Sequence, residues 1–211
     1  MAGSKYPTPT PNLSGIVGRT VDPGPFVFGS SARKVSRRVT IATLQLEAAG
    51  WKTWLTTLFP AYVTSGFADR HVELWEWGWA IQCGVRPPPF IAVWPRGGAK
   101  STSAELAAVA VGSRRRRSYA LYICGTQDQA DDHVQNIGAL LESVQVERYY
   151  PDMADRLATK FGSSKGWRHN RLRTAAGFTI DAVGLDKTAR GVKLEEQRPD
   201  LLIIDDIDHE L

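Results

Sequence analysis

Apolar residues recur along the chain with two spacings, one typical of helices and one typical of buried strands. Helical spacing or strong helix propensity predicts helices over residues 41–58, 69–82, 103–111 and 126–142. Gly50 is expected to break the first of these helices. Thr126 is the expected N-cap of the last, and Gln129, three residues on, completes a capping box.

Short, wholly apolar runs predict the strands. They cover residues 90–94, 118–124 and 201–204, with a further strand pair at 171–174 and 178–180. We expect the runs at 90–94 and 201–204 to be buried strands, because apolar residues fill each run without alternation. A short helix and loops are expected within 144–170, and a polar loop over 186–197.

Strands that alternate with helices indicate an α/β fold with a parallel sheet sandwiched by helices. We predict a disordered, basic, Pro/Gly/Ser-rich lead-in over residues 1–40. A helical lead-in with an aromatic-rich helix follows over 41–89, and residues 90–211 form the core.

Composition narrows the class of protein. The chain has 211 residues, 43% of them hydrophobic, and no apolar run approaches the ~20 residues that a membrane span needs. The N-terminus has no signal pattern, so we expect a cytosolic protein that uses no membrane. Cys83 and Cys124 are expected to be buried and reduced. The net charge of +4 permits contact with nucleic acid but does not establish it.

Residues 95–102 have the layout of a phosphate-binding loop, because a strand, two glycines and a helix follow one another there. In such a loop, backbone N–H groups and the positive end of the helix cradle an anion. The ammonium of Lys100 would reach the terminal phosphates of a nucleotide, and the hydroxyl of Ser101 would hold Mg²⁺. The predicted nucleotide-binding residues include Gly97, Gly98, Ala99, Lys100, Ser101 and Thr102. The alternative is an ordinary tight turn, and a left-handed backbone at Ala99 would cost roughly 1–2 kcal/mol.

Two carboxylates follow the apolar run at 201–204, at the edge of the sheet where open α/β folds bind ligands. Asp205 would hold Mg²⁺ through water, and Asp206 would orient the attacking water or accept its proton. The loop and the acids, in this order, predict nucleotide binding.

Three other segments each allow more than one interpretation. The arginines at 114–117 could form a solvated connection, contact DNA phosphates or reach the nucleotide of a neighbouring subunit. Residues 67–71 and the nearby tryptophans could pack in the core or contact an adenine ring. The basic run at 33–38 could be solvated or could touch DNA or an acidic partner.

With these motifs placed, residues 65–208 resemble the N-terminal ATPase domain of a tailed-phage terminase large subunit. The motifs that carry the resemblance are FADRH…LWEW at 67–77, WPRGGAKST at 94–102, GTQDQA at 125–130, Arg190-Gly191 and RPDLLIIDD at 198–206.

The resemblance implies a P-loop NTPase fold of the additional-strand class, with ATP and Mg²⁺ as cofactors. It implies ATP hydrolysis coupled to translocation of double-stranded DNA in the cytoplasm of a bacterial host. The implied partners are the viral portal and procapsid, the small terminase subunit and further copies of the chain in a ring.

The resemblance also implies roles for individual residues. Arg96 corresponds to the loop arginine that contacts the γ-phosphate, and Lys100 contacts the β- and γ-phosphates. Ser101 holds Mg²⁺, Asp205 is the Walker B aspartate and Asp206 is the catalytic carboxylate. Arg190 belongs to an Arg-Gly element of unassigned role.

The chain departs from the family at three points. Ala99 stands where the family usually has Gly, and Asp206 stands where motor ATPases often have Glu, so Asp208 or Glu210 could share its role. The chain also ends just past the predicted Walker B strand. We therefore expect a truncated domain that lacks one central strand and has no nuclease activity.

Two other functions remain open from the sequence. One is another P-loop nucleic-acid motor, such as a helicase or recombination ATPase. The other is a nucleotide-binding assembly module that does not hydrolyse ATP.

Overall fold

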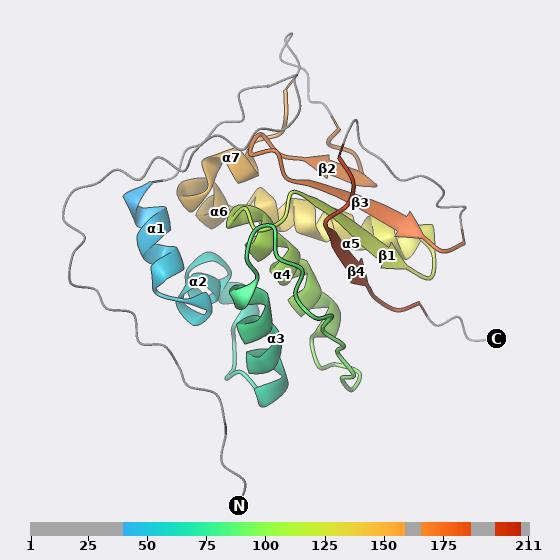
Figure 1. Ribbon diagram of the computed structural model, residues 1–211, viewed down its shortest axis with the longest axis horizontal. Coiled ribbons are helices and arrows are strands. Elements are labelled where there is room, and N and C mark those ends of the chain that lie inside the picture. Colours follow the sequence, from blue (N-terminus) through green and yellow to red (C-terminus); the bar gives the residue numbers. More distant parts are fainter. Residues whose placement is uncertain (1–39, 159–165, 187–196, 208–211) are drawn as a thin grey trace, which may run out of the picture. The chain divides into compact units, whose positions relative to one another are not determined.

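The computed structural model describes residues 40–158, 166–186 and 197–207 (Figure 1). These residues belong to the second of the two units into which the chain divides, residues 34–211. The disordered lead-in predicted for residues 1–40 lies outside the described residues except at its last position. Most of the loop predicted at 186–197 lies outside them as well.

A four-stranded sheet forms the centre of the described unit, with strand order β2-β3-β1-β4. Its strands are β1 (Tyr119–Cys124), β2 (Arg171–Arg173), β3 (Thr179–Gly184) and β4 (Leu201–Ile204). β1 pairs in parallel with both β3 and β4, whereas β2 is antiparallel to β3. The protein is therefore an α/β protein with a mostly parallel sheet flanked by helices, and the predicted strand pair is confirmed as β2 and β3.

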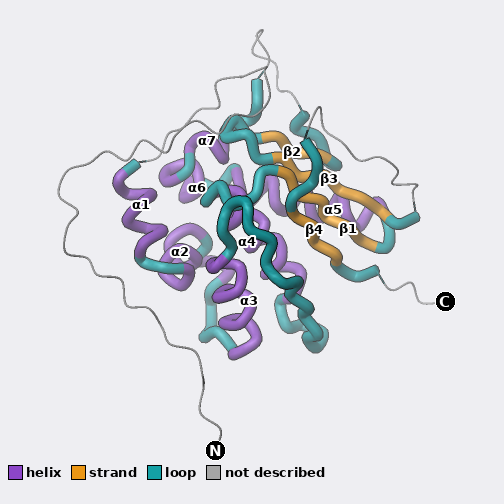
Figure 2. Tube along the Cα trace, viewed as in Figure 1, coloured by secondary structure: helices purple, strands orange, loops and turns teal. Residues whose placement is uncertain are grey.

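Helices account for most of the remaining described residues (Figure 2). They are α1 (Ile41–Ala48), α2 (Trp51–Leu58), the 3-10 helix η1 (Pro60–Tyr62), α3 (Asp69–Ala80), α4 (Lys100–Ser113), α5 (Gln127–Leu141), α6 (Val144–Tyr149) and α7 (Pro151–Ala154). The four helices predicted from spacing and propensity are all present, and the short helix expected within 144–170 is resolved into α6 and α7.

Local chemistry explains two of the helix boundaries. Gly50 separates α1 from α2 with a φ of 88°, a backbone conformation that glycine adopts without steric cost. The Thr126 hydroxyl accepts a hydrogen bond from the Gln129 amide, and the Gln129 side chain accepts one from the Thr126 amide, both at 3.3 Å. The capping box predicted for α5 is therefore confirmed.

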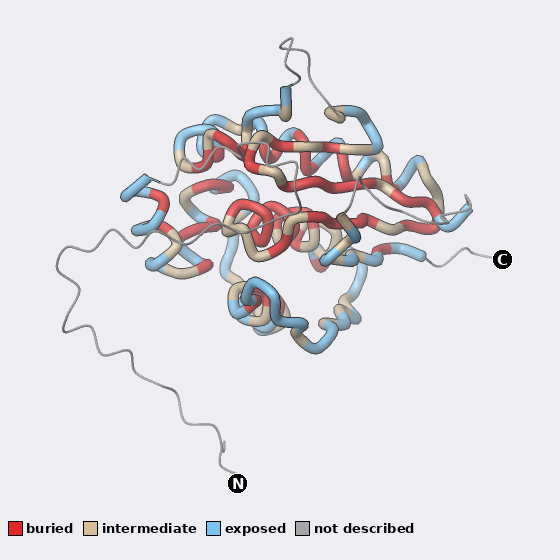
Figure 3. The backbone as a smooth tube through the Cα atoms, turned by 45° about the horizontal axis from the view of Figure 1, so that its top comes forward, coloured by how far each residue is buried: buried red, intermediate tan, exposed pale blue. Residues whose placement is uncertain are grey.

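The main core lies on one face of the sheet (Figure 3). Alternate β1 residues Ala120, Tyr122 and Cys124 point into it and are fully buried. Trp54 of α2 and Trp75 of α3 are buried in the same core, so the aromatic-rich segment packs as core there. On the other face is a smaller cluster of Tyr119, Leu121, Val183 and Ile123, and among the described residues only strands contribute to it.

The run at 90–94 is extended, but it pairs with no described strand, so the strand predicted there is wrong. Ile91 is 80% exposed and Val93 90% exposed. Apolar composition predicts burial, but it does not supply a neighbouring strand to bond with. β4 already occupies the position next to β1, and no strand among the described residues pairs with its other edge.

Two expectations of burial also fail. β4 is parallel as predicted but not buried, because Leu202 and Ile204 are each 59% exposed at the edge of the sheet. Cys83 is exposed, since it lies in the turn after α3, whereas Cys124 is buried in β1. Both cysteines are free, and burial raises the pKa of Cys124 to about 12. Across the described residues, no helix has the length and apolar character to cross a membrane.

Candidate phosphate-binding site

The loop before α4 adopts the strained conformation considered from the sequence. Ala99 is left-handed, with φ 58° and ψ 31°, and α4 begins immediately afterwards at Lys100. Gly97 also has a positive φ, of 78°. At Gly98 a Cβ atom would lie 2.9 Å from the carbonyl oxygen of Pro95, so only glycine fits there. This turn leaves the first N–H groups of α4 without a side-chain cap, which suits an anion.

The N-terminus of α3 supports this loop. The Ala68 amide donates to His71 Nδ1 at 3.2 Å, so the neutral imidazole carries its proton on Nε2. That nitrogen donates to the carbonyl of Gly98 at 3.0 Å, and the imidazole meets the ring of Trp94 edge to face at 5.1 Å. Residues 67–71 therefore position the loop itself, a contact that neither sequence interpretation foresaw.

The two predicted halves of the site meet at Lys100. Its ammonium lies 2.8 Å from Oδ1 of Asp206 and 3.1 Å from Oδ1 of Asp205. β4 delivers the acids to this point, and the Asp206 carbonyl, with φ 45° at that residue, accepts a hydrogen bond from Gly125 after β1. The parallel register of β4 with β1 thus brings residues from distant parts of the sequence to the carboxyl edge of the sheet.

The two acids differ in environment. The Asp205 side chain is 3% exposed and that of Asp206 is 62% exposed. Burial alone would raise the pKa of Asp205, but hydrogen bonds from Ser101 and Lys100, with the Lys100 charge, outweigh it and lower that pKa. The hydrogen bond to Asp206 is the main cause that raises the pKa of Lys100. Asp205 is therefore buried and held as a carboxylate, whereas the Asp206 side chain is accessible.

The donor set suits Mg²⁺. Ser101 directly follows Lys100 in the first turn of α4, and its hydroxyl lowers the pKa of Asp205, so the site offers two oxygen ligands of the kind Mg²⁺ prefers. Lys100 supplies the positive charge that neutralises both acids. Ser101 and Asp205 are the residues that would hold the metal ion.

The other residues predicted for the site have fewer contacts or lie outside the described residues. Arg96 is exposed on the loop, and no described residue bonds to its side chain. Thr102 lies partly buried in the first turn of α4. Arg190, Asp208 and Glu210 lie outside the described residues.

Comparisons with family models, curated proteins and solved structures find no match to this chain. The assignment of the site therefore rests on the geometry and chemistry of its own residues.

Sequence reasoning missed a polar group beneath the acids. Tyr122 of β1 donates a hydrogen bond to Oδ2 of Asp205 at 3.2 Å. His133 of α5 stacks on the Tyr122 ring, and its Nδ1 lies 2.7 Å from Oε1 of Glu105, which is buried in α4. The same Glu105 oxygen accepts from Asn136 at 3.0 Å. The only signal in the sequence is that Glu105 lies four residues after Ser101, on the same face of α4.

Three of the four arginines at 114–117 are held by neighbouring elements, so a solvated connection is wrong for these three. Arg117 is only 8% exposed and donates to the carbonyls of Gln82, Val85 and Arg116. Arg114 lies 3.6 Å from the centre of the Trp79 ring, and Arg115 pairs with Asp152. These arginines tie the α4–β1 connection to neighbouring elements.

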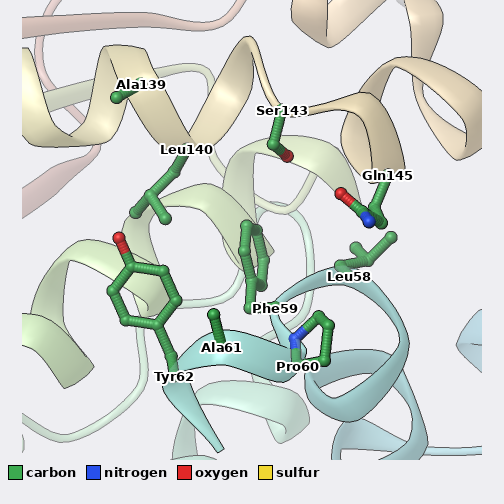
Figure 4. A pocket seen from close by; sticks show the side chains of 9 residues that line it. All are labelled: Leu58, Phe59, Pro60, Ala61, Tyr62, Ala139, Leu140, Ser143 and Gln145. Atoms are coloured by element: carbon green, nitrogen blue, oxygen red, sulfur yellow. The ribbon is translucent and has the colours of Figure 1, made fainter.

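Two hollows lie away from the loop and the acids. One, of about 240 Å³, lies between η1 and the end of α5. Figure 4 shows Tyr62, Phe59 and Leu140 around it, with Ser143 and Gln145 as polar neighbours. The Ser143 hydroxyl already accepts from the Val146 amide, and no charged side chain lines the hollow. The other, of about 380 Å³, is lined by Arg168, Arg171, Arg173 and Asp181 among others. No residue predicted for the site lines either hollow.

Proposed function

We propose that the chain is a Mg²⁺-dependent ATP hydrolase of the P-loop class. The single observation that carries the proposal is the contact of Lys100 with both acids that follow β4. A left-handed turn, a lysine at the first helical position and a following hydroxyl support it further. An ordinary tight turn would give Lys100 no reason to meet two carboxylates at the carboxyl edge of a parallel sheet.

In this proposal some residues of the site bind the nucleotide and the metal ion, and one residue transfers a proton. The N-terminus of α4 and the ammonium of Lys100 bind the phosphates, and Arg96 reaches the terminal phosphate from the exposed part of the loop. Ser101 and Asp205 hold Mg²⁺, which neutralises charge on the phosphate oxygens when bound. Asp206 orients the attacking water and accepts its proton, a role that its accessibility permits.

Lys100 links these two roles. When its ammonium moves from Asp206 to the phosphates, the Asp206 carboxylate loses its partner and becomes available as a base. In the absence of nucleotide the same ammonium neutralises the base.

The further proposal, that the hydrolase is the motor of a viral DNA-packaging machine, rests on the resemblance to terminase large subunits. Its partners would be double-stranded DNA, the portal of a procapsid, a small terminase subunit and further copies of the chain in a ring. ATP turnover stimulated by procapsid supports this motor, whereas stimulation by single-stranded DNA supports a helicase or recombination ATPase.

The test is binding of a fluorescent ATP analogue together with phosphate release by the 211-residue chain. We expect Lys100→Ala and Asp206→Asn each to lower turnover by about 100-fold or more. Only Lys100→Ala should also weaken binding of the nucleotide. The matched controls are Lys52→Ala and Asp132→Asn, which change an exposed lysine and an exposed aspartate on other helices.

The outcomes separate the candidates. A folded chain that binds no ATP overturns the proposal. A chain that binds ATP but releases no phosphate is a nucleotide-binding module and not a hydrolase. Equal losses in the control variants would show that the substitutions act through the fold.

A further inference from the structure

A series of contacts passes beneath the candidate metal ligand Asp205. It runs from Asp205 to Tyr122, to His133 and to Glu105, which is four residues from Ser101 on α4. β1, α5 and α4 each contribute one member, and Asp205 directly follows β4 (Figure 1). The series therefore connects the proposed metal-binding carboxylate to the body of two helices.

We propose that Tyr122, held in place by His133 and Glu105, is a positioning residue that sets the orientation of the Asp205 carboxylate for Mg²⁺. This inference rests on the proposed function, because it concerns the same metal site.

The two carboxylate oxygens of Asp205 have different partners. Oδ2 accepts from the Tyr122 hydroxyl at 3.2 Å, whereas Oδ1 faces the ammonium of Lys100 at 3.1 Å. A carboxylate rotates about its last bond unless one oxygen is bonded. The bond to Oδ2 therefore keeps Oδ1 oriented away from β1 partners and available to the Mg²⁺ that Asp205 would hold.

Tyr122 is suited to this task because its side chain is closely packed. Its side chain is fully buried, and its ring stacks on the His133 imidazole with centroids 4.8 Å apart and planes inclined by 24°. Since the Asp205 carboxylate is ionised, the phenol acts as the donor.

His133 is held in turn by Glu105 of α4. Its Nδ1 lies 2.7 Å from Oε1 of Glu105, and Asn136 donates to the same oxygen at 3.0 Å. Glu105 is buried, and these two α5 side chains are the described partners of its carboxylate. A buried carboxylate is costly without such partners, so this pairing resists displacement.

Tyr122→Phe removes only the hydroxyl and keeps the ring and its stacking. Outer-shell partners of metal ligands typically contribute 10- to 100-fold to metal affinity, so we expect about 10-fold weaker Mn²⁺ binding in the nucleotide complex. Mn²⁺ substitutes for Mg²⁺ and is measured by electron paramagnetic resonance with a non-hydrolysable ATP analogue. Affinity for the analogue without metal, in the presence of EDTA, should not change.

The same strand supplies a matched control. Tyr119 is also fully buried in β1, and its hydroxyl lies 2.6 Å from Oδ2 of the buried Asp181, on the other face of the sheet. Tyr119→Phe removes an equivalent bond away from the site and should leave Mn²⁺ affinity unchanged.

The role of His133 is tested by a double-mutant cycle. His133→Ala should weaken Mn²⁺ binding in the wild-type background and have no further effect in the Tyr122→Phe background, because His133 acts through that hydroxyl. A structural role alone would give additive losses.

Three results would overturn the inference. They are a Mn²⁺ affinity for folded Tyr122→Phe equal to that of the wild type, an equal loss in Tyr119→Phe, or additive losses in the cycle. In each of these the wild type still binds nucleotide, so the proposed function survives. A wild type that binds no nucleotide overturns both the inference and the proposed function.

Discussion

Ala99 shows the cost of building this loop without a third glycine. It adopts φ 58°, a conformation that costs an L-residue roughly 1–2 kcal/mol. Its methyl group is exposed, so removal loses little packing. The strain is therefore local and can be relieved by a single substitution.

Ala99→Gly should raise the free energy of unfolding by about 1 kcal/mol, measured by urea denaturation. Gly relieves the left-handed strain, and this gain exceeds the entropy that Gly adds to the unfolded chain. Ala107→Gly, within α4, is the matched control and should lower stability by about 1 kcal/mol. Destabilisation by both substitutions would contradict the strain at residue 99.

His133 should make stability depend on pH. Its hydrogen bond to Glu105 is the main cause that raises its pKa above 6.5, and the charges of Asp205 and Asp206 add to this effect. Protonated His133 therefore contributes stability that is fully present below pH 6.5 and is lost as the pH rises through the higher pKa of the folded state. Urea denaturation between pH 5.5 and 8.5 should show this decline.

His133→Gln should flatten that decline, because glutamine cannot take up the proton. The control is Gln135→Ala, which changes an exposed, uncharged residue of the same helix and should preserve the slope. An unaltered slope in His133→Gln would assign the pH dependence to other groups.

At the scale of elements, the caps and helical spacing were readable from the sequence and the strand pairing was not. Thr126 and Gln129 are three residues apart, so their reciprocal bonds follow from local sequence. The run at 90–94 has the same apolar character as β4, yet only β4 pairs with β1. Periodicity reports burial tendency, whereas a strand also needs a partner that only the tertiary structure supplies.

Charged residues explain the other differences at this scale. The strand predicted at 178–180 extends further, to Gly184. It includes the buried residue Asp181, and a buried charge in a strand is not expected from the sequence. Arg171 and Tyr119 satisfy that carboxylate from two other positions of the sheet. Arg117 is buried for a similar reason, because three backbone carbonyls bond its guanidinium. Apart from the adjacent Arg116, these partners are 10 or more residues away in sequence, so composition does not reveal them.

The support that α3 gives to the phosphate loop should be measurable. His71→Ala removes the bond from Nε2 to Gly98, and a hydrogen bond of this kind contributes about 1 kcal/mol. We expect ATP binding to weaken by about fivefold and the amides of residues 96–100 to exchange hydrogen faster. Glu76→Ala, on the exposed side of α3, is the control. Unchanged exchange in His71→Ala would show that the loop holds its own conformation.

At the scale of the described unit, the sequence predicted which residues of the candidate site come together. It did not predict how helices and strands are arranged on the two faces of the sheet. Lys100, Ser101, Asp205 and Asp206 meet as the motif order predicted. The sheet was expected to be sandwiched by helices, whereas the described cluster on its second face comes from strands alone. The free edge of β4 leaves apolar side chains exposed.

That free edge should favour self-association. Leu202 is 59% exposed on a strand edge that no other described strand covers, a combination that templates pairing between copies. Light scattering should show a molecular mass that rises with protein concentration, and Leu202→Lys should suppress this rise. Leu44→Lys is the control. Leu44 is 58% exposed, but it lies in helix α1 and not on a strand. Equal suppression by both variants would assign the effect to added charge.

The contact of Lys100 with the two acids has a consequence for the energetics of turnover. Its ammonium is an internal counter-ion, so the arrival of a nucleotide on the proposed site is an ion exchange in which phosphate oxygens replace carboxylates. The affinity that results is a difference between two strong attractions rather than the full strength of either. In the proposed reaction the same carboxylates would compete for the lysine after hydrolysis, and the resting state of the protein would thereby assist the departure of the product.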